Sequence, residues 1–345
     1  MGATFERISE DKKSSLVVKS IRDALIKAGC FPKKFEGPIS LQFELTSKCN
    51  CKCSHCYNRS GEGFSKDLMT GERWLEFVRK LVVGGGIFQA TISGGEPLTQ
   101  TDYLWDLMNI LGNDGTIFNL ITNGYLFNQD VLKHLLNYKF YWIQVSVDSP
   151  YASFHDKFRH LEGCWEKAIK AAYAIALSGI PLRIASTITP KTMDCLEDFI
   201  KMSINLGASY LIIGEVIPSG RAVDNDDILL SEKERDYFYS TMEELKKRYA
   251  KSISILVSGS QRVQLEYAEK NSLDGAIIRP DGSIRLDCGC PFVIGNVLKD
   301  DIFDVWKKAQ NSWDNLLVRK YIESCDPITG KSNFIINYND KDILI

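Results

Sequence analysis

The chain has 345 residues, with 42 Lys plus Arg against 44 Asp plus Glu and a net charge of -2 at pH 7. This length suggests about two domains, or one large barrel with an appendage. A hydrophobic fraction of 44% and a charged fraction of 25% are typical of globular proteins, which excludes a disordered, collagen-like or coiled-coil chain. The balanced charge argues against a nucleic-acid partner, because such proteins usually carry a basic surface.

The start of the chain shows no targeting signal. The stretch MGATFERISEDKKSS is polar and lacks both the apolar segment and the small-residue cleavage site of a signal peptide. No apolar run reaches the roughly 18 residues that are needed to cross a bilayer. We therefore expect a cytoplasmic protein without a membrane partner.

The pattern along the chain predicts a helical lead-in over residues 1–37, followed by alternating strands and helices over residues 38–222. The predicted strands are Ser40–Leu45, Gln89–Ser93, Phe118–Thr122, Trp142–Val147, Leu182–Ile188 and Tyr210–Ile217. The predicted helices are Arg73–Val83, Tyr103–Leu111, Gln129–Leu136, Trp165–Leu177 and Cys195–Leu206. Strands that are nearly all apolar favour a parallel sheet with right-handed crossovers. We expect an α/β fold, a partial barrel of six strand-helix units.

The sequence changes character after residue 222. An acidic linker leads to a predicted helix that Ser231 opens, with Glu234 at the spacing of a capping box. Short strands, a PDG turn and three more cysteines follow. Residues 223–345 are therefore expected to form a linker helix and a small α+β extension.

Cysteine content is the first unusual feature, because four of the ten cysteines lie between Cys49 and Cys56. A reducing compartment argues against disulfides, so a dense cluster indicates metal binding or catalysis. Cys49, Cys53 and Cys56 have C-x3-C-x2-C spacing on the loop that leaves the first strand. A four-iron cube normally takes four thiolates, so three leave one iron open to a ligand with an amine and a carboxylate.

A zinc site with Cys51 as the fourth ligand is the alternative. Structural zinc loops prefer C-x2-C pairs that are set well apart, which this sequence lacks. The other interpretation of Cys51 is a small buried hydrophobic residue, and we favour it.

The run TSKCNCKCSHCYN resembles the TxxCNxxCxYC signature of radical S-adenosylmethionine (radical SAM) enzymes. The pieces SGGEP at 93–97, TNG at 122–124 and SVDS at 146–149 follow in the expected order at strand ends. The resemblance extends over roughly residues 38–220. It implies the radical SAM type of partial (β/α)6 barrel, with a [4Fe-4S] cluster on Cys49, Cys53 and Cys56 and with SAM on its open iron.

The same resemblance implies a SAM-binding set at the carboxyl ends of the strands. Gly94 and Gly95 allow close approach of backbone, and the Glu96 carboxylate suits the methionine ammonium. Arg159 pairs with the SAM carboxylate through two hydrogen bonds. The alternative for the Gly-Gly-Glu segment is an ordinary strand-to-helix turn. The alternative for Arg159 is a solvated surface arginine. The whole set is His55, Gly94, Gly95, Glu96, Asn123, Ser146, Arg159 and Ser186.

Residues 274–306 resemble the SPASM extension, or its shorter Twitch form, which binds auxiliary iron–sulfur clusters. At most one auxiliary cluster is expected, since the further cysteines of a full extension are missing. Cys288, Cys290 and Cys325 are its thiolate candidates, with Asp274 or Asp287 as an oxygen ligand. The alternatives are a cluster-free hairpin over the barrel mouth, or a free thiol that returns a hydrogen atom to a substrate radical.

The resemblance implies an enzyme that cleaves SAM to a 5′-deoxyadenosyl radical and removes hydrogen from a ribosomally made precursor peptide. Cross-linking and epimerisation are the expected outcomes, and the implied electron donor is a protein such as flavodoxin or ferredoxin. A radical SAM dehydrogenase of a small alcohol or amine is one alternative. A non-enzymatic zinc or iron–sulfur scaffold is another.

Overall fold

The computed structural model describes residues 37–63, 66–271, 275–309, 311–326, 330–337 and 341–345. The helical lead-in predicted for residues 1–37 lies almost entirely outside these residues. Among the described helices, none is both long and apolar enough to cross a bilayer.

The described strands form one sheet of 11 strands, in the order β11-β10-β9-β8-β1-β2-β3-β4-β5-β6-β7. Strands β1 to β7 pair as parallel neighbours. The sheet is not closed, because β11 and β7 are its two ends. The predicted α/β class with a partial barrel is confirmed. The strands are β1 (Ser40–Glu44), β2 (Gln89–Ser93), β3 (Ile117–Thr122), β4 (Phe140–Ser146), β5 (Leu182–Ile188), β6 (Tyr210–Glu215), β7 (Ser254–Ser258), β8 (Gly275–Ile278), β9 (Ser283–Arg285), β10 (Phe292–Asn296) and β11 (Ile343–Leu344).

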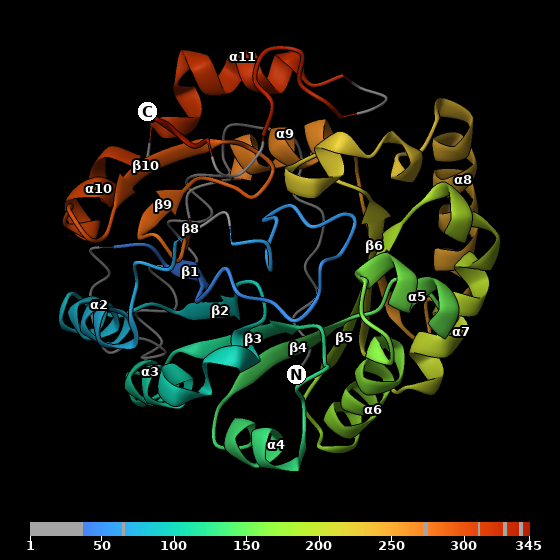
Figure 1. Cartoon of the computed structure of the whole chain (residues 1–345), viewed down its shortest axis with the longest axis horizontal. Helices are drawn as coiled ribbons and strands as arrows, with labels where there is room; N and C mark the ends of the chain where they lie inside the picture. The colour runs from blue at the N-terminus through green and yellow to red at the C-terminus, as the bar shows by residue number, and fades with distance from the viewer. Residues whose placement is uncertain (1–36, 64–65, 272–274, 310, 327–329, 338–340) are drawn as a thin grey trace.

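Helices lie around the outside of this curved sheet (Figure 1). Those between the parallel strands connect one strand to the next and cover the outer face of the sheet. The helices are α2 (Gly71–Val83), α3 (Thr101–Asn113), α4 (Gln129–Leu135), α5 (Ala152–Arg159), α6 (Cys164–Leu177), α7 (Leu196–Asn205), α8 (Glu232–Arg248), α9 (Gln261–Asn271), α10 (Ile302–Ala309) and α11 (Leu316–Ser324).

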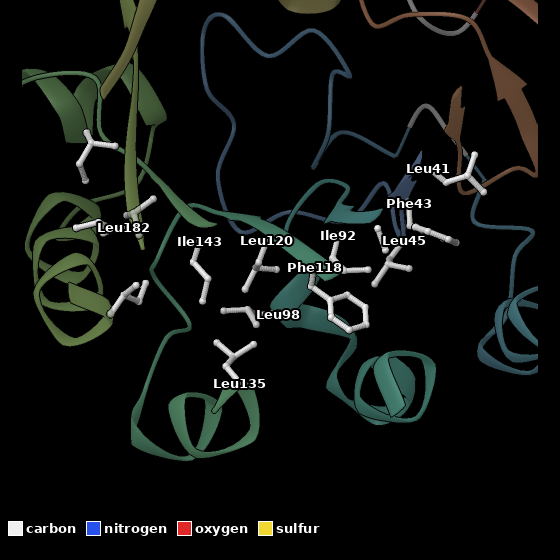
Figure 2. Close-up of a cluster of buried hydrophobic side chains, with 14 of the residues drawn as sticks. Leu41, Phe43, Leu45, Ile92, Leu98, Phe118, Leu120, Leu135, Ile143 and Leu182 are labelled. Atoms are coloured by element: carbon white, nitrogen blue, oxygen red, sulfur yellow. The ribbon is translucent and has the colours of Figure 1, made fainter. Parts of the chain in front are cut away.

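The main core lies between the sheet and these helices. Phe43, Ile92 and Leu120 are fully buried there and point away from the inside of the barrel (Figure 2). Successive side chains of a strand point to opposite faces. Thr91 and Asn119, one position before Ile92 and Leu120, therefore face inward, where the Asn119 amide donates to the Thr91 hydroxyl over 3.1 Å. The alternation gives the barrel an apolar outer face and a polar inner face.

The sheet continues across the boundary predicted at residues 222 and 223. Strand β7 extends the parallel sheet beside β6, with Tyr210 opposite Ser254. Strand β8 pairs in parallel with β1 at the other side, with Ser40 opposite Gly275. The C-terminal third of the chain therefore supplies the strands that flank the six predicted ones.

Helix α8 begins with the predicted capping box. The Glu234 amide donates to the Ser231 hydroxyl over 3.4 Å, and the Ser231 amide donates to the Glu234 carboxylate over 2.8 Å. We expect Ser231→Ala to lower the free energy of unfolding by about 1 kcal/mol, because both contacts satisfy amides that the first helical turn leaves free. Urea unfolding measures this change. Ser240→Ala, at an exposed position inside the same helix, is the control, and an equal loss there would contradict the capping role.

Candidate functional site

The loop that leaves β1, residues 45–61 (the cysteine loop), lies directly against the backbone of the Gly-Gly-Glu segment. The Gly95 amide donates to the Thr46 carbonyl over 2.6 Å, and the Glu96 amide donates to the Lys48 carbonyl over 2.9 Å. A Cβ at Gly95 would lie 2.1 Å from the Lys48 carbonyl oxygen. Glycine is therefore required here for close packing of the chain on itself.

Helix α5 holds the other side of the cysteine loop. The Lys52 amide donates to the Arg159 carbonyl over 3.1 Å, and the Ser54 amide donates to the Phe158 carbonyl over 2.9 Å. The His55 ring stacks on the Phe158 ring, with centroids 4.7 Å apart. Burial lowers the pKa of His55, so its ring is neutral at neutral pH. The His55 ring thus packs on Phe158, and its contact with SAM stays a prediction.

The four thiols of the loop fall into two groups. Cys49, Cys53 and Cys56 are half-buried. Cys51 is only 1% exposed, and its sulfur lies 3.8 Å from the sulfur of Cys164. The interpretation of Cys51 as a buried residue is therefore confirmed. Its sulfur contacts Cys164 in the interior of the protein.

Electrostatics also separate the thiols. A hydrogen bond from Cys51 lowers the pKa of Cys53 to about 5; burial opposes this shift and the charge of Arg159 adds to it. Burial, and then the neighbouring Cys53, raise the pKa of Cys56. Cys53 is therefore a thiolate at neutral pH.

Unpartnered polar atoms gather beside these sulfurs. Among the residues that the structure describes, Asn50 Nδ2 and His55 Nδ1 are buried and have no hydrogen-bond partner. Asn123 Nδ2 lies 3.8 Å from Cys49 Sγ and 2.9 Å from Asn50 Oδ1. Among the described residues, no three Cys, His, Asp or Glu side chains converge on the position of a single metal ion. Three free thiols with adjacent amide donors fit a polynuclear anionic cluster, in which each thiolate binds a different iron.

Glu96 is fully buried next to this loop. Its carboxylate accepts hydrogen bonds from the Thr122 hydroxyl over 2.7 Å, the Asn123 amide over 2.8 Å and the Leu98 amide over 3.2 Å. Burial raises the pKa of Glu96 to about 7, against the effect of these donors. Glu96 therefore joins the ends of two strands and changes charge near neutral pH.

Arg159 forms a buried ion pair with Asp148, with 2.8 Å between Nε and Oδ2. The interpretation of Arg159 as a solvated arginine is wrong, because its residue is 5% exposed. Although burial opposes its charge, the Arg159 guanidinium holds the pKa of Asp148 below its ordinary value. Asp148 also accepts from the Thr187 amide over 3.1 Å. Within the described part of the chain, the two terminal nitrogens of Arg159 have no hydrogen-bond partner, which leaves them for an anion.

The two serines of the predicted SAM-binding set differ in position. Ser146 pairs with Ala185 and lies on the inner face of the barrel. Ser186 pairs with the buried Ile213 and shares its face with Ile184, so it points toward the helices. Its hydroxyl is buried and has no hydrogen-bond partner in the described part of the chain. The prediction that Ser186 faces the cofactor disagrees with this side-chain direction.

The C-terminal thiols are not gathered in the described residues. The Cys290 thiol lies 3.7 Å from the Asp287 carbonyl oxygen and the Cys325 thiol 3.3 Å from that of Tyr321, and both are buried in a second apolar cluster. Cys288 is half-buried, and burial followed by the Asp287 charge raises its pKa. Asp274 lies outside the described residues. This arrangement favours the cluster-free interpretation of the extension.

A role for one tyrosine of the cysteine loop was not predicted from the sequence. The Tyr57 hydroxyl donates to the Glu44 carboxylate over 2.8 Å. Burial, followed by the charges of Glu44 and Cys288, raises the pKa of Tyr57. Tyr57 therefore connects the cysteine loop to the end of β1 and lies near the C-terminal extension. In the sequence, only the position of Tyr57 directly after Cys56 could have indicated that it belongs to the site.

Comparison with known proteins agrees with this site. Residues 43–203 match the profile of the Radical SAM superfamily. The AdoMet-dependent heme synthase of Methanosarcina barkeri is 24% identical over 295 residues, which cover 79% of this chain and 83% of that protein. The mycofactocin maturase MftC of Mycolicibacterium smegmatis is 27% identical over 299 residues, which cover 81% of this chain and 73% of that protein.

A solved structure shares the fold. Streptococcus suis SuiB, bound to the precursor peptide SuiA, superposes with a TM-score of 0.62 at 16% identity, over 92% of this chain and 74% of that chain. Radical SAM proteins use a [4Fe-4S] cluster and SAM. Together with the three thiols of the cysteine loop, these matches identify residues 43–203 as a radical SAM domain and indicate that the protein is an enzyme.

Proposed function

We propose that this enzyme modifies a ribosomally made precursor peptide by removing a hydrogen atom from one of its carbons. The observation on which this proposal rests is the loop of three free thiols at the carboxyl ends of the parallel strands, beside a buried carboxylate and a buried arginine. When bound, the [4Fe-4S] cluster supplies the electron that cleaves SAM to a 5′-deoxyadenosyl radical.

Each residue has a defined part in this proposal. Cys49, Cys53 and Cys56 hold the cluster. The ionised Glu96 accepts the methionine ammonium of SAM, and the free nitrogens of Arg159 take its carboxylate. A surrounding of buried side chains keeps water from the radical.

The peptide substrate is supported by relatives. MftC is a mycofactocin maturase, and SuiB binds the precursor peptide SuiA in its crystal structure. Of the two expected outcomes, the C-terminal thiols favour epimerisation over cross-linking. Cys290 and Cys325 are packed in an apolar cluster, whereas the raised pKa of Cys288 keeps its thiol protonated. A protonated thiol is the form that gives a hydrogen atom back to a carbon radical.

One incubation tests the proposal. Reduced, anaerobic enzyme is mixed in D2O with SAM and short peptides encoded beside its gene, and the peptides are analysed by mass spectrometry. Epimerisation gives a one-deuterium increase, while cross-linking removes two hydrogens. Formation of 5′-deoxyadenosine without any change in a peptide would contradict the peptide proposal and leave SAM cleavage intact.

The heme synthase relative keeps a second candidate open. It covers 79% of this chain, so a non-peptide substrate, such as the small alcohol or amine considered from the sequence, is compatible with the same site. Turnover of such a compound in the absence of peptide would favour this candidate.

A further inference from the structure

The loop after β6 places one arginine against the cysteine loop. Arg221 Nε donates to the Cys53 carbonyl over 2.7 Å, and Nη2 donates to the Ser60 carbonyl over 3.0 Å. Its third nitrogen, Nη1, pairs with Glu62, which directly follows the loop. The Arg221 guanidinium thus contacts the second half of the loop, from Cys53 to Ser60, and Glu62 beyond it.

The backbone beside this arginine makes the contact tighter. The Arg221 amide donates to the Cys56 carbonyl over 3.0 Å. A Cβ at Gly220 would lie 2.1 Å from the Tyr57 carbonyl oxygen, and Gly220 has φ of +59°. The Gly220 amide in turn donates to the Asn337 carbonyl over 2.9 Å. The C-terminal segment therefore supports the turn that presses on Cys56 and Tyr57.

These contacts restrain two of the three proposed ligands. Cys53 and Cys56 each accept a hydrogen bond through their carbonyl oxygens from Arg221. The planar guanidinium holds the Cys53 and Ser60 carbonyls at a fixed separation, which a flexible lysine ammonium would not do. Its positive charge also lies close to the thiolates, where added negative charge is stabilised by a nearby cation.

We propose that Arg221 is a positioning residue, which fixes Cys53 and Cys56 for cluster binding and makes the cluster easier to reduce. This inference rests on the proposed role of the three thiols. In the reduction, one electron passes from a one-electron donor such as dithionite to the cluster, whose charge becomes more negative by one. No bond forms or breaks in that step, so the effect of Arg221 is read as a change in midpoint potential.

Three variants separate the two effects. Arg221→Met removes the charge and all side-chain donors and leaves the backbone hydrogen bond to Cys56, while Arg221→Lys keeps the charge and loses the planar fork. Arg235→Met is the matched control, because the side chains of Arg221 and Arg235 are 15% and 14% exposed, each pairs with a glutamate, and Arg235 Nε donates to Glu215 on β6 over 2.8 Å. Each protein is reconstituted anaerobically and examined by redox titration with electron paramagnetic resonance and by iron release to a chelator.

We expect Arg221→Met to shift the midpoint potential to a more negative value and to release iron about tenfold faster, which is the size of effect seen when a support of a metal ligand is lost. Arg221→Lys should restore the potential and still release iron faster than wild type. Arg235→Met should match wild type in both measurements. If Arg221→Met does not fold, wild-type iron release by Arg221→Lys overturns the inference by itself.

The outcomes distinguish this inference from the proposed function. A wild-type protein that binds no iron–sulfur cluster would overturn both. A wild-type cluster that Cys53→Ala abolishes, together with unchanged potential and iron release in Arg221→Met, would overturn only the role of Arg221.

Discussion

Cys53→Ala should abolish SAM cleavage. The Cys53 thiolate is one of three half-buried sulfurs on the cysteine loop, and hydrogen bonding from Cys51 with the charge of Arg159 keeps it ionised. Loss of a residue that only supports a metal ligand costs about 10–100-fold in affinity or activity. Loss of a ligand itself should therefore reduce 5′-deoxyadenosine formation by more than about 100-fold. The measurements are anaerobic iron and sulfide content and 5′-deoxyadenosine released from SAM.

Cys51→Ala is the matched control for that experiment. It removes a thiol from the same loop, two residues away, but the Cys51 sulfur contacts Cys164 in the interior. We expect this variant to keep about four irons per chain and to cleave SAM, because bound iron keeps the Cys53 thiol ionised without the hydrogen bond from Cys51. The free energy of unfolding should fall by about 1 kcal/mol, because the substitution is at a buried site. Equal loss of metal in both variants would favour the zinc site with Cys51 as a ligand and would contradict the iron–sulfur assignment.

The parallel strands could be predicted because each is a short apolar run between turn residues. Strands β2 and β5 have the predicted bounds, and the helices that follow β1 and β2 differ from prediction by only a few residues. Helix α5 was not predicted. Its buried side chains include His155 and Arg159, which look like solvent-exposed positions in a hydrophobic pattern. Their burial depends on Asp148 and the cysteine loop, which approach only in the folded protein.

The direction of Ser186 was available in the sequence. Leu182, Ile184 and Ile188 are apolar at alternate positions, so an even-numbered residue of β5 belongs to the outer face. The strand-end position of Ser186 suggested a cofactor contact, but alternation along the strand decides which face a side chain occupies. The same rule places Ser146 on the inner face.

Long-range contacts to the cysteine loop could not be predicted. The spacing of the cysteines places three thiols on one loop, yet the loop is held by α5, by the Gly-Gly-Glu segment and by Arg221. The hydrogen bond between Arg221 and Cys53 spans 168 positions in sequence. No local pattern encodes such a pairing, because both partners are ordinary polar groups before folding.

Glu96→Gln should weaken SAM binding and remove a pH dependence from it. Burial raises the pKa of Glu96 to about 7, and only the ionised carboxylate accepts the methionine ammonium with full charge assistance. In wild type, SAM affinity should therefore rise with pH up to about 7 and fall by close to tenfold per pH unit below it. A hydrogen bond to a charged group contributes about 1.5–3 kcal/mol, so Glu96→Gln should lose roughly 10–100-fold in affinity at pH 8. Equilibrium binding of SAM at pH 6, 7 and 8 measures both effects.

The stability of the SAM-free protein separates a binding defect from a folding defect. The pKa of Glu96 in the folded protein is raised above its ordinary value of 4.5. The stability that this group contributes is therefore fully present below about pH 4.5 and is lost as the pH rises through about 7. Glu96→Gln lacks this loss, because its amide stays neutral, and its single oxygen can still accept from the Thr122 hydroxyl and the Leu98 amide, although the acceptor of the Asn123 amide is lost. Thermal unfolding between pH 6 and 8 should therefore vary less with pH in the variant than in wild type. A variant that binds SAM as tightly as wild type at pH 8, with a folded state of normal stability, would show that Glu96 serves only to join the strand ends.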